Sequence, residues 1–141
     1  MAMGLRSLVD ALHIGLKARG FPVRPSFAFV LLASRQNPLT GHEVAQLLGI
    51  TKQAASKLAD DMEQQQLLTR KPHPSDARAK LLHIAPKGRR LLAAAEEIYA
   101  ESEAEWAAVI GYKRLDALRA DLTEVLRVIH GGELPPIRPT W

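Results

Sequence analysis

Apolar residues recur at intervals of three and four along the first part of the chain, a spacing that predicts amphipathic helices. The first such stretch runs from Arg6 to Arg19 and ends at Gly20, which lets the chain leave the helical conformation. A second, shorter stretch follows, and we expect Ser26 to cap its beginning. It ends before Asn37-Pro38, because the residue that precedes a proline disfavours the helical conformation.

Capping residues predict two further helices joined by a short turn. Thr40 and Glu43 have the spacing of a capping box, in which each side chain accepts a hydrogen bond from the backbone N–H of the other residue. This helix ends at Gly49, because glycine readily takes the left-handed conformation. Thr51 caps the next helix, Lys52 to about Gln65. Two capped helices separated by about three residues form a helix-turn-helix.

The second of these helices has an apolar side and a polar side. The apolar side carries Ala55, Leu58, Ala59 and Met62, and the polar side carries Lys52, Gln53, Ser56, Lys57 and Asp60. Lysine pairs with guanine or phosphate, glutamine pairs with base edges, and serine pairs with either. The N-terminus of a helix also favours phosphate. This helix therefore has the composition expected of a helix that enters a DNA groove.

A short β-hairpin is predicted directly after this helix. Leu67–Lys71 and Ala79–Ile84 have the composition of strands, and the turn-forming residues Pro72–Ala77 lie between them. Arg78 and Lys80 lie beside this turn. A β-hairpin that follows a recognition helix is the wing of a winged helix-turn-helix.

The rest of the chain predicts two long helices. Pro86 suits the first position of one helix, which breaks at Gly111, and the next helix ends at Gly131. Their apolar stripes are Leu91, Ala95, Ile98, Ser102, Trp106 and Val109, and then Leu115, Leu118, Leu122, Val125 and Ile129. A stripe on a long helix needs a partner, which is either another helix of the chain or a second copy. We expect a homodimer with a twofold axis.

These elements predict a mostly α-helical fold with a small β-wing. We expect a winged helix-turn-helix DNA-binding domain over residues 25–85 and a helical dimerisation region formed by residues 1–24 and 86–130. Residues 131–141 form a Pro-rich tail, which we expect to be extended.

Composition excludes several classes of protein. Of the 141 residues, 47% are hydrophobic and 24% are charged, as in a globular chain. The longest apolar run, Phe27–Ala33, is too short to span a membrane. The lack of cysteine excludes disulfides, zinc–thiolate sites and thiol nucleophiles, and we expect a cytoplasmic protein. We recognise no nucleophile–base pair, metal cluster or glycine-rich phosphate loop, so we expect no enzymatic activity and no cofactor.

The net charge of +4 is unevenly distributed. Residues 1–84 carry 11 basic and 6 acidic side chains, and between Gln64 and Arg90 Asp76 is the one acid among seven bases. A stretch of one sign is typical of a protein with a polyanionic partner. A solvated charged face has the same composition, and charge alone does not separate the two.

At this point the sequence from Leu39 to Gly88 resembles the MarR (multiple antibiotic resistance regulator) family of winged-helix regulators. The most specific element is Asp76-x-Arg78-x-Lys80, which is followed by an apolar strand and Pro86-Lys87-Gly88. The resemblance implies a bacterial transcriptional regulator, by default a repressor. Such a protein binds a pseudo-palindromic operator in double-stranded DNA as a homodimer.

The resemblance also implies roles for individual residues. The start of the recognition helix enters the major groove, and its DNA-binding residues are Thr51, Lys52, Gln53, Ser56 and Lys57. Arg78 enters the minor groove, where concentrated negative potential attracts arginine, and Asp76 orients that arginine. Arg70, Lys80 and Lys87 contact phosphate.

Among the departures from the family pattern, two concern the ends of helices. Gln66 stands where a glycine is usual, so we expect a non-glycine residue with positive φ. Ala85 stands where a hydroxyl cap is usual, which leaves the helix that begins at Pro86 without a side-chain cap.

Family members often bind small aromatic or phenolic effectors between the dimer helices and the winged domain. By resemblance, His13, Phe21 and His42 lie near that junction. We favour core packing as the role of the phenylalanine and ordinary polar positions for the two histidines. We expect no metal site, since no two histidines have helical spacing, but a zinc site assembled across helices stays open. The alternatives are therefore a metal-responsive regulator and a winged-helix protein-interaction module without operator binding.

Overall fold

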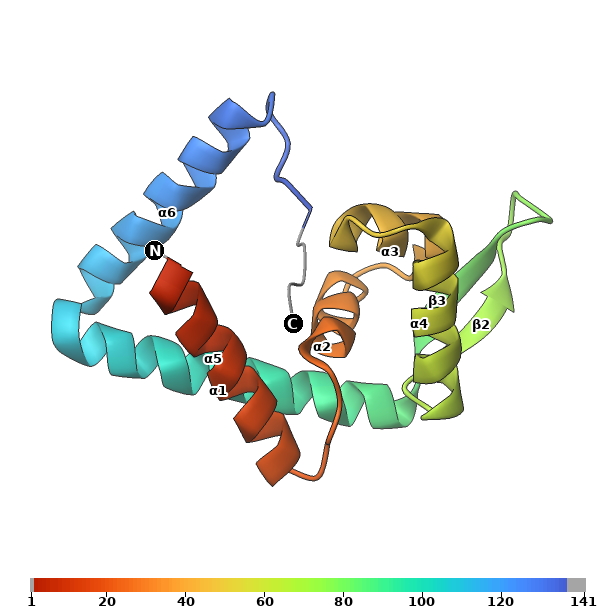
Figure 1. Ribbon diagram of the computed structural model, residues 1–141, viewed down its shortest axis with the longest axis horizontal. Coiled ribbons are helices and arrows are strands. Elements are labelled where there is room, and N and C mark those ends of the chain that lie inside the picture. Colours follow the sequence, from red (N-terminus) through yellow and green to blue (C-terminus); the bar gives the residue numbers. More distant parts are fainter. Residues whose placement is uncertain (1, 137–141) are drawn as a thin grey trace.

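The computed structural model describes residues 2–136 and has six helices and a three-stranded sheet in that part of the chain. The elements are α1 (Ala2–Ala18), α2 (Pro25–Ala33), β1 (Leu39–Thr40), α3 (Gly41–Leu48), α4 (Lys52–Gln64), β2 (Leu68–Pro72), β3 (Lys80–Ile84), α5 (Pro86–Ile110) and α6 (Tyr112–Ile129). Figure 1 shows the hairpin of β2 and β3 projecting at one end of the molecule and α6 at the other. The predicted fold, mostly helical with a small β-wing, is confirmed.

Helix α2 lies in the centre of the core. It is apolar on nearly all sides, and Phe27, Val30 and Leu31 are almost completely buried. A helix with this composition is stable only when other elements surround it. The prediction that Ser26 caps this helix is wrong, because Pro25 occupies its first turn and Ser26 is a buried residue inside it.

The long helix α5 connects the two ends of the molecule. It packs against α2, α1 and α6, and in Figure 1 α1 crosses it. The crossing of α1 and α5 is close at Gly15, where an added Cβ would lie 2.8 Å from the side chain of Ile98. Leu12 and Leu16 on the same helix are fully buried.

The sheet has the strand order β1-β3-β2, and both pairs are antiparallel. The hairpin of β2 and β3 lies within one residue of the predicted strands. The third strand, β1, was not predicted, because two residues are too short to show an alternating pattern. In the register, Arg70 lies opposite Leu82 and Lys71 lies opposite Leu81.

The predicted caps of the helix-turn-helix are confirmed. Thr40 and Glu43 form the capping box, in which Thr40 N–H donates to Glu43 at 2.7 Å and Glu43 N–H donates to the Thr40 hydroxyl at 3.2 Å. Gly49 is left-handed, and Thr51 accepts a hydrogen bond from Ala54 N–H at 3.1 Å. Gln66 has φ of 62°, as its place in the family pattern predicts.

Helix α6 is mostly exposed in the single protomer. Leu115 is buried, but Val125 and Ile129 are 55% and 65% exposed. Val109, which the periodicity places on the apolar stripe of α5, is 85% exposed in the single protomer. No helix within residues 2–136 is long and apolar enough to cross a membrane. The final part of the predicted tail, residues 137–141, lies outside the described residues.

Candidate nucleic-acid interface

Helix α4 presents its polar side to solvent, as the sequence predicts. Lys52, Gln53, Ser56 and Lys57 are exposed, and so is the capping residue Thr51. Ala55, Ala59 and Met62 on the opposite side are buried in the core. The helix is therefore held by its apolar side and leaves a polar side free for a partner.

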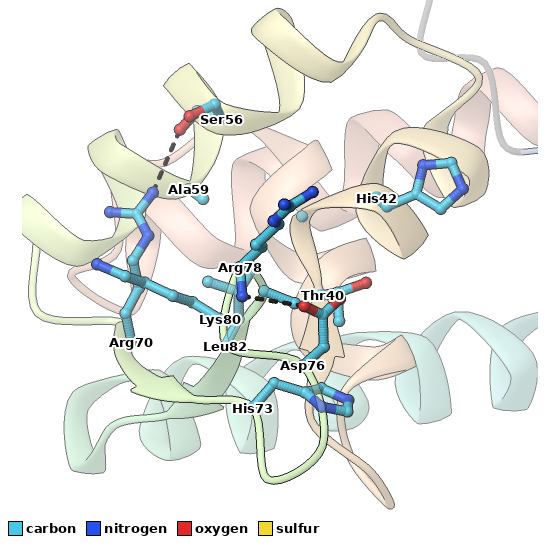
Figure 2. Close-up of a pocket in the computed structure, with 12 residues that line it drawn as sticks. Thr40, His42, Ser56, Ala59, Arg70, His73, Asp76, Arg78, Lys80 and Leu82 are labelled. Carbon is cyan, nitrogen blue, oxygen red and sulfur yellow. Dashed lines mark hydrogen bonds between the residues drawn. The ribbon is translucent and has the colours of Figure 1, made fainter.

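The turn between β2 and β3 is organised by Asp76. Its carboxylate accepts the backbone N–H of Arg78 at 2.9 Å, and its carbonyl oxygen accepts the backbone N–H of Ala79 at 3.1 Å. The first bond is an Asx-turn, in which a side chain replaces a backbone acceptor. The carboxylate holds the backbone of Arg78 and not its guanidinium, and Figure 2 shows the guanidinium extending away from it.

A groove of about 530 Å³ separates α3 and α4 from the wing. Figure 2 shows the side chains that line it. Five residues predicted to bind DNA are among them, namely Ser56, Arg70, Asp76, Arg78 and Lys80. Lys52, Gln53, Lys57 and Lys87 lie outside this groove.

Most cations of the winged end have no partner within the chain. In the described residues, eight basic side chains between positions 52 and 90 form no ion pair or side-chain hydrogen bond; we call these eight the free basic set. They are Lys52, Lys57, Lys71, Arg78, Lys80, Lys87, Arg89 and Arg90. Lys71, Arg89 and Arg90 were part of the basic stretch in the sequence but not of the predicted site, because nothing in a single sequence separates a free cation from a paired one.

Arg70 differs from its neighbours because carboxylates surround it. Its guanidinium donates to Glu63 at 2.5 Å and to Asp60 at 2.6 Å, and its side chain is 21% exposed. Burial lowers the pKa of Arg70, but the hydrogen bonds to Asp60 and Glu63 outweigh this, so the pKa is raised. The predicted phosphate contact therefore competes with two partners already in place.

The acids of α4 are all paired with arginines. Asp60 and Glu63 bind Arg70, and Asp61 lies 3.4 Å from Arg24. Pairing offsets the negative charge that these acids place next to a surface rich in free cations.

The capping box of α3 also perturbs a titrating group. The backbone N–H and the hydroxyl of Thr40 hold the pKa of Glu43 below its usual range, because both donate to the charged carboxylate. His73 and His42 lower it slightly further.

The three residues predicted to bind an effector are not brought into one cavity by the described contacts. His42 lines the groove beside the wing, and His13 is exposed on α1. Phe21 is half-buried and packs against the core. Within residues 2–136, no group of three or more His, Cys, Asp or Glu side chains could hold a metal ion.

Comparison with known proteins extends over nearly the whole chain. Residues 25–79 match the model of the MarR family. The transcriptional repressor CouR bound to a 23-mer DNA duplex is 26% identical, with a TM-score of 0.75 over 88% of this chain and 87% of that chain. A mutant of MepR from S. aureus bound to an oligodeoxyribonucleotide is 21% identical, with a TM-score of 0.62 over 91% of this chain and 94% of that chain.

A third structure contains a small molecule. CouR from Rhodococcus jostii RHA1 bound to p-coumaroyl-CoA is 21% identical, with a TM-score of 0.66 over 84% of this chain and 83% of that chain. No curated protein matches the chain. The family match runs from α2 to β2 and ends before β3, and the structural likeness adds the order and packing of the remaining elements. Residues 25–79 therefore match the MarR family, and the described helices and strands share the fold of the DNA-bound CouR structure.

Proposed function

We propose that this protein is a transcriptional regulator that binds double-stranded DNA as a homodimer. The observation that carries the proposal is the free basic set, none of which has an ion partner in the described residues. Arg78 and Lys80 line the groove, and Lys52 and Lys57 lie on the exposed side of α4. DNA supplies a regular array of phosphates that would neutralise them. The DNA-bound structures of CouR and MepR, which share the fold, support the same assignment.

The exposed side of α4 would enter the major groove. Lys52, Gln53, Ser56 and Lys57 lie on its first turns, where side chains of a recognition helix reach base edges. Arg78 on the projecting turn would reach the flanking minor groove, whose negative potential favours arginine. Lys80 and Lys87 would bind phosphate.

The apolar side of α6 supports the homodimer. Val125, Leu126, Val128 and Ile129 are exposed in one protomer, and an apolar pocket of about 170 Å³ lies between α1, α5 and the earlier part of α6. Packing this surface against a second copy would remove it from water. We assign residues 1–24 and 86–130 to this dimerisation region and residues 25–85 to DNA binding.

We further propose that the protein represses transcription and is released by a small effector. The protein has one conformation that fits DNA and one that does not. A ligand lowers the affinity for DNA when it binds more tightly to the second conformation than to the first. The complex of CouR with p-coumaroyl-CoA supports an effector with an aromatic group. Neither a metal nor an enzymatic step is part of the proposal.

Selection of bound fragments from genomic DNA tests this function. We expect enrichment of one sequence with two similar half-sites whose centres are about one helical turn apart. The purified protein should then bind that duplex with two protomers, as measured by sedimentation. Enrichment of no sequence in this selection would reject operator binding and favour a protein-interaction module.

A further inference from the structure

Arg70 connects the wing to the recognition helix. It lies in β2 opposite Leu82 of β3, and residues opposite each other share one face of a hairpin. Leu82 is buried, so this face is the one turned toward the body of the protein. Its neighbour Lys71 belongs to the other face, is exposed and has no ion partner in the described chain.

Four hydrogen bonds hold Arg70 against α4. The guanidinium donates to Glu63 at 2.5 Å, to Asp60 at 2.6 Å and to the carbonyl oxygen of Ser56 at 3.5 Å; Figure 2 draws the last of these. The backbone N–H of Arg70 donates to the second oxygen of Glu63 at 3.1 Å. Positions 56, 60 and 63 lie on one side of a helix, so a single planar guanidinium spans two turns of α4.

These contacts leave the guanidinium of Arg70 with little capacity to bind a DNA phosphate. A phosphate that bound Arg70 would have to compete with two carboxylates already within hydrogen-bonding distance. If it succeeded, Asp60 and Glu63 would lose their counter-charge at a surface that approaches a polyanion. Lys80 lines the same groove without any carboxylate partner, and is the better phosphate ligand.

From this geometry we propose that Arg70 is a positioning residue: it fixes the angle between wing and recognition helix and neutralises Asp60 and Glu63, and it does not contact phosphate. The inference rests on the proposed DNA binding and replaces the role that the family resemblance implies for this residue. A wing and a helix that must enter different grooves bind better when their relative placement is set beforehand, because less conformational freedom is lost on binding.

A mutant cycle separates this role from a phosphate contact. Arg70→Ala is measured in the native background and in the Asp60→Asn/Glu63→Gln background, by fluorescence anisotropy with the selected duplex. We expect a loss of roughly tenfold or more in the native background and less than about threefold in the neutral background, where no uncompensated acid is left. An equal or larger loss in the neutral background would overturn the proposal, because a phosphate contact does not depend on the acids.

Lys80→Ala is the matched control, since it removes one cation from the same groove. We expect it to lower the slope of log affinity against log salt by about one per protomer. In the neutral background, Arg70→Ala should leave that slope unchanged. Arg70→Lys keeps the charge without the planar fork, so a fall in affinity for this variant with unchanged circular dichroism identifies loss of geometry and not of folding.

Hydrogen exchange of the free protein tests the connection without DNA. Arg70→Ala should speed amide exchange across β2 and β3 and leave α1 and α5 unchanged, whereas Lys80→Ala should change neither. Unchanged exchange in β2 and β3 would overturn the positioning role. If the wild-type protein binds no DNA, the proposed function fails, and this exchange measurement still decides whether Arg70 fixes the wing.

Discussion

The two ends of the molecule differ in the chemistry of the side chains that have no partner within the chain. At the winged end, between positions 52 and 90, cations are left unpaired around a groove and an exposed polar helix side. At the other end, apolar side chains of α6 are left uncovered, while Arg119 pairs with both Glu103 and Asp116. Unpaired cations suit a polyanion, and an uncovered apolar helix suits a second copy of itself. This contrast is the reason for proposing two separate binding surfaces of different chemistry on one chain.

The largest expected effect comes from breaking the apolar end. Val125→Asp combined with Ile129→Asp places two charges on the exposed apolar side of α6, and burying them in a dimer would cost several kcal/mol. We expect a monomer in sedimentation and a loss of operator affinity of about a hundredfold or more, because two linked half-sites no longer bind together. The exposed pair Lys113→Glu and Arg114→Glu, also on α6, is the control. A dimer that survives the apolar substitutions would show that this surface is not the interface.

Changes at the winged end should leave the dimer intact. Arg78→Ala removes the side chain proposed to enter the minor groove, and we expect operator affinity to fall by about tenfold to a hundredfold. Its guanidinium binds no carboxylate, so the substitution breaks no ion pair in the described structure. Sedimentation should still give a dimer. Affinity equal to that of wild type in the same titration would remove Arg78 from the interface.

At the winged end, the two threonine caps should respond differently to pH. Thr40→Ala should lower the free energy of unfolding by about 1 kcal/mol at neutral pH. Since the pKa of Glu43 is lowered in the folded state, its stabilisation is present above the unfolded pKa and is lost as pH falls through the folded value. The penalty for Thr40→Ala should therefore shrink in acid. Thr51→Ala, which removes a cap without a carboxylate partner, should show no such change in chemical denaturation.

The smallest effect concerns the helical end. Burial raises the pKa of Tyr99 to about 12, so this phenol stays protonated where an unfolded tyrosine ionises. The folded state then holds a proton that the unfolded state has lost, and stability should fall as pH rises above about 10. Ultraviolet titration should show one phenol ionising late, and Tyr99→Phe should abolish that late step. Absence of that late step in the wild-type protein would mean that the phenol of Tyr99 is not shielded from water.

Local interactions were predictable from the sequence, whereas contacts between distant segments were not. The Thr40–Glu43 box and the left-handed Gly49 each depend on a few neighbouring residues, whereas the positive φ of Gln66 followed from the family resemblance. Serine prefers the capping position, but here Pro25 begins the helix and the surrounding core buries Ser26 inside it.

The candidate site was predictable from the sequence only in part, because some of its contacts also join distant segments. Charge and helical spacing located the polar side of α4 and the turn at Arg78. They could not reveal that Arg70 faces Asp60 and Glu63, because that pairing requires β2 to fold back along α4. Charge and helical spacing also do not show whether an apolar stripe on a helix is covered by other helices of the same chain or stays exposed. Val109 and most of α6 are exposed.

The salt dependence of operator binding tests the central claim most directly. If the free basic set binds phosphates, log affinity should fall linearly with log salt concentration, with a slope that reflects several phosphates per protomer. Neutralising one member of the set, as in Lys57→Gln, should reduce that slope by about one per protomer, and neutralising Lys17 on α1 should not. Affinity that is independent of salt, or slopes that respond equally to both substitutions, would contradict the account.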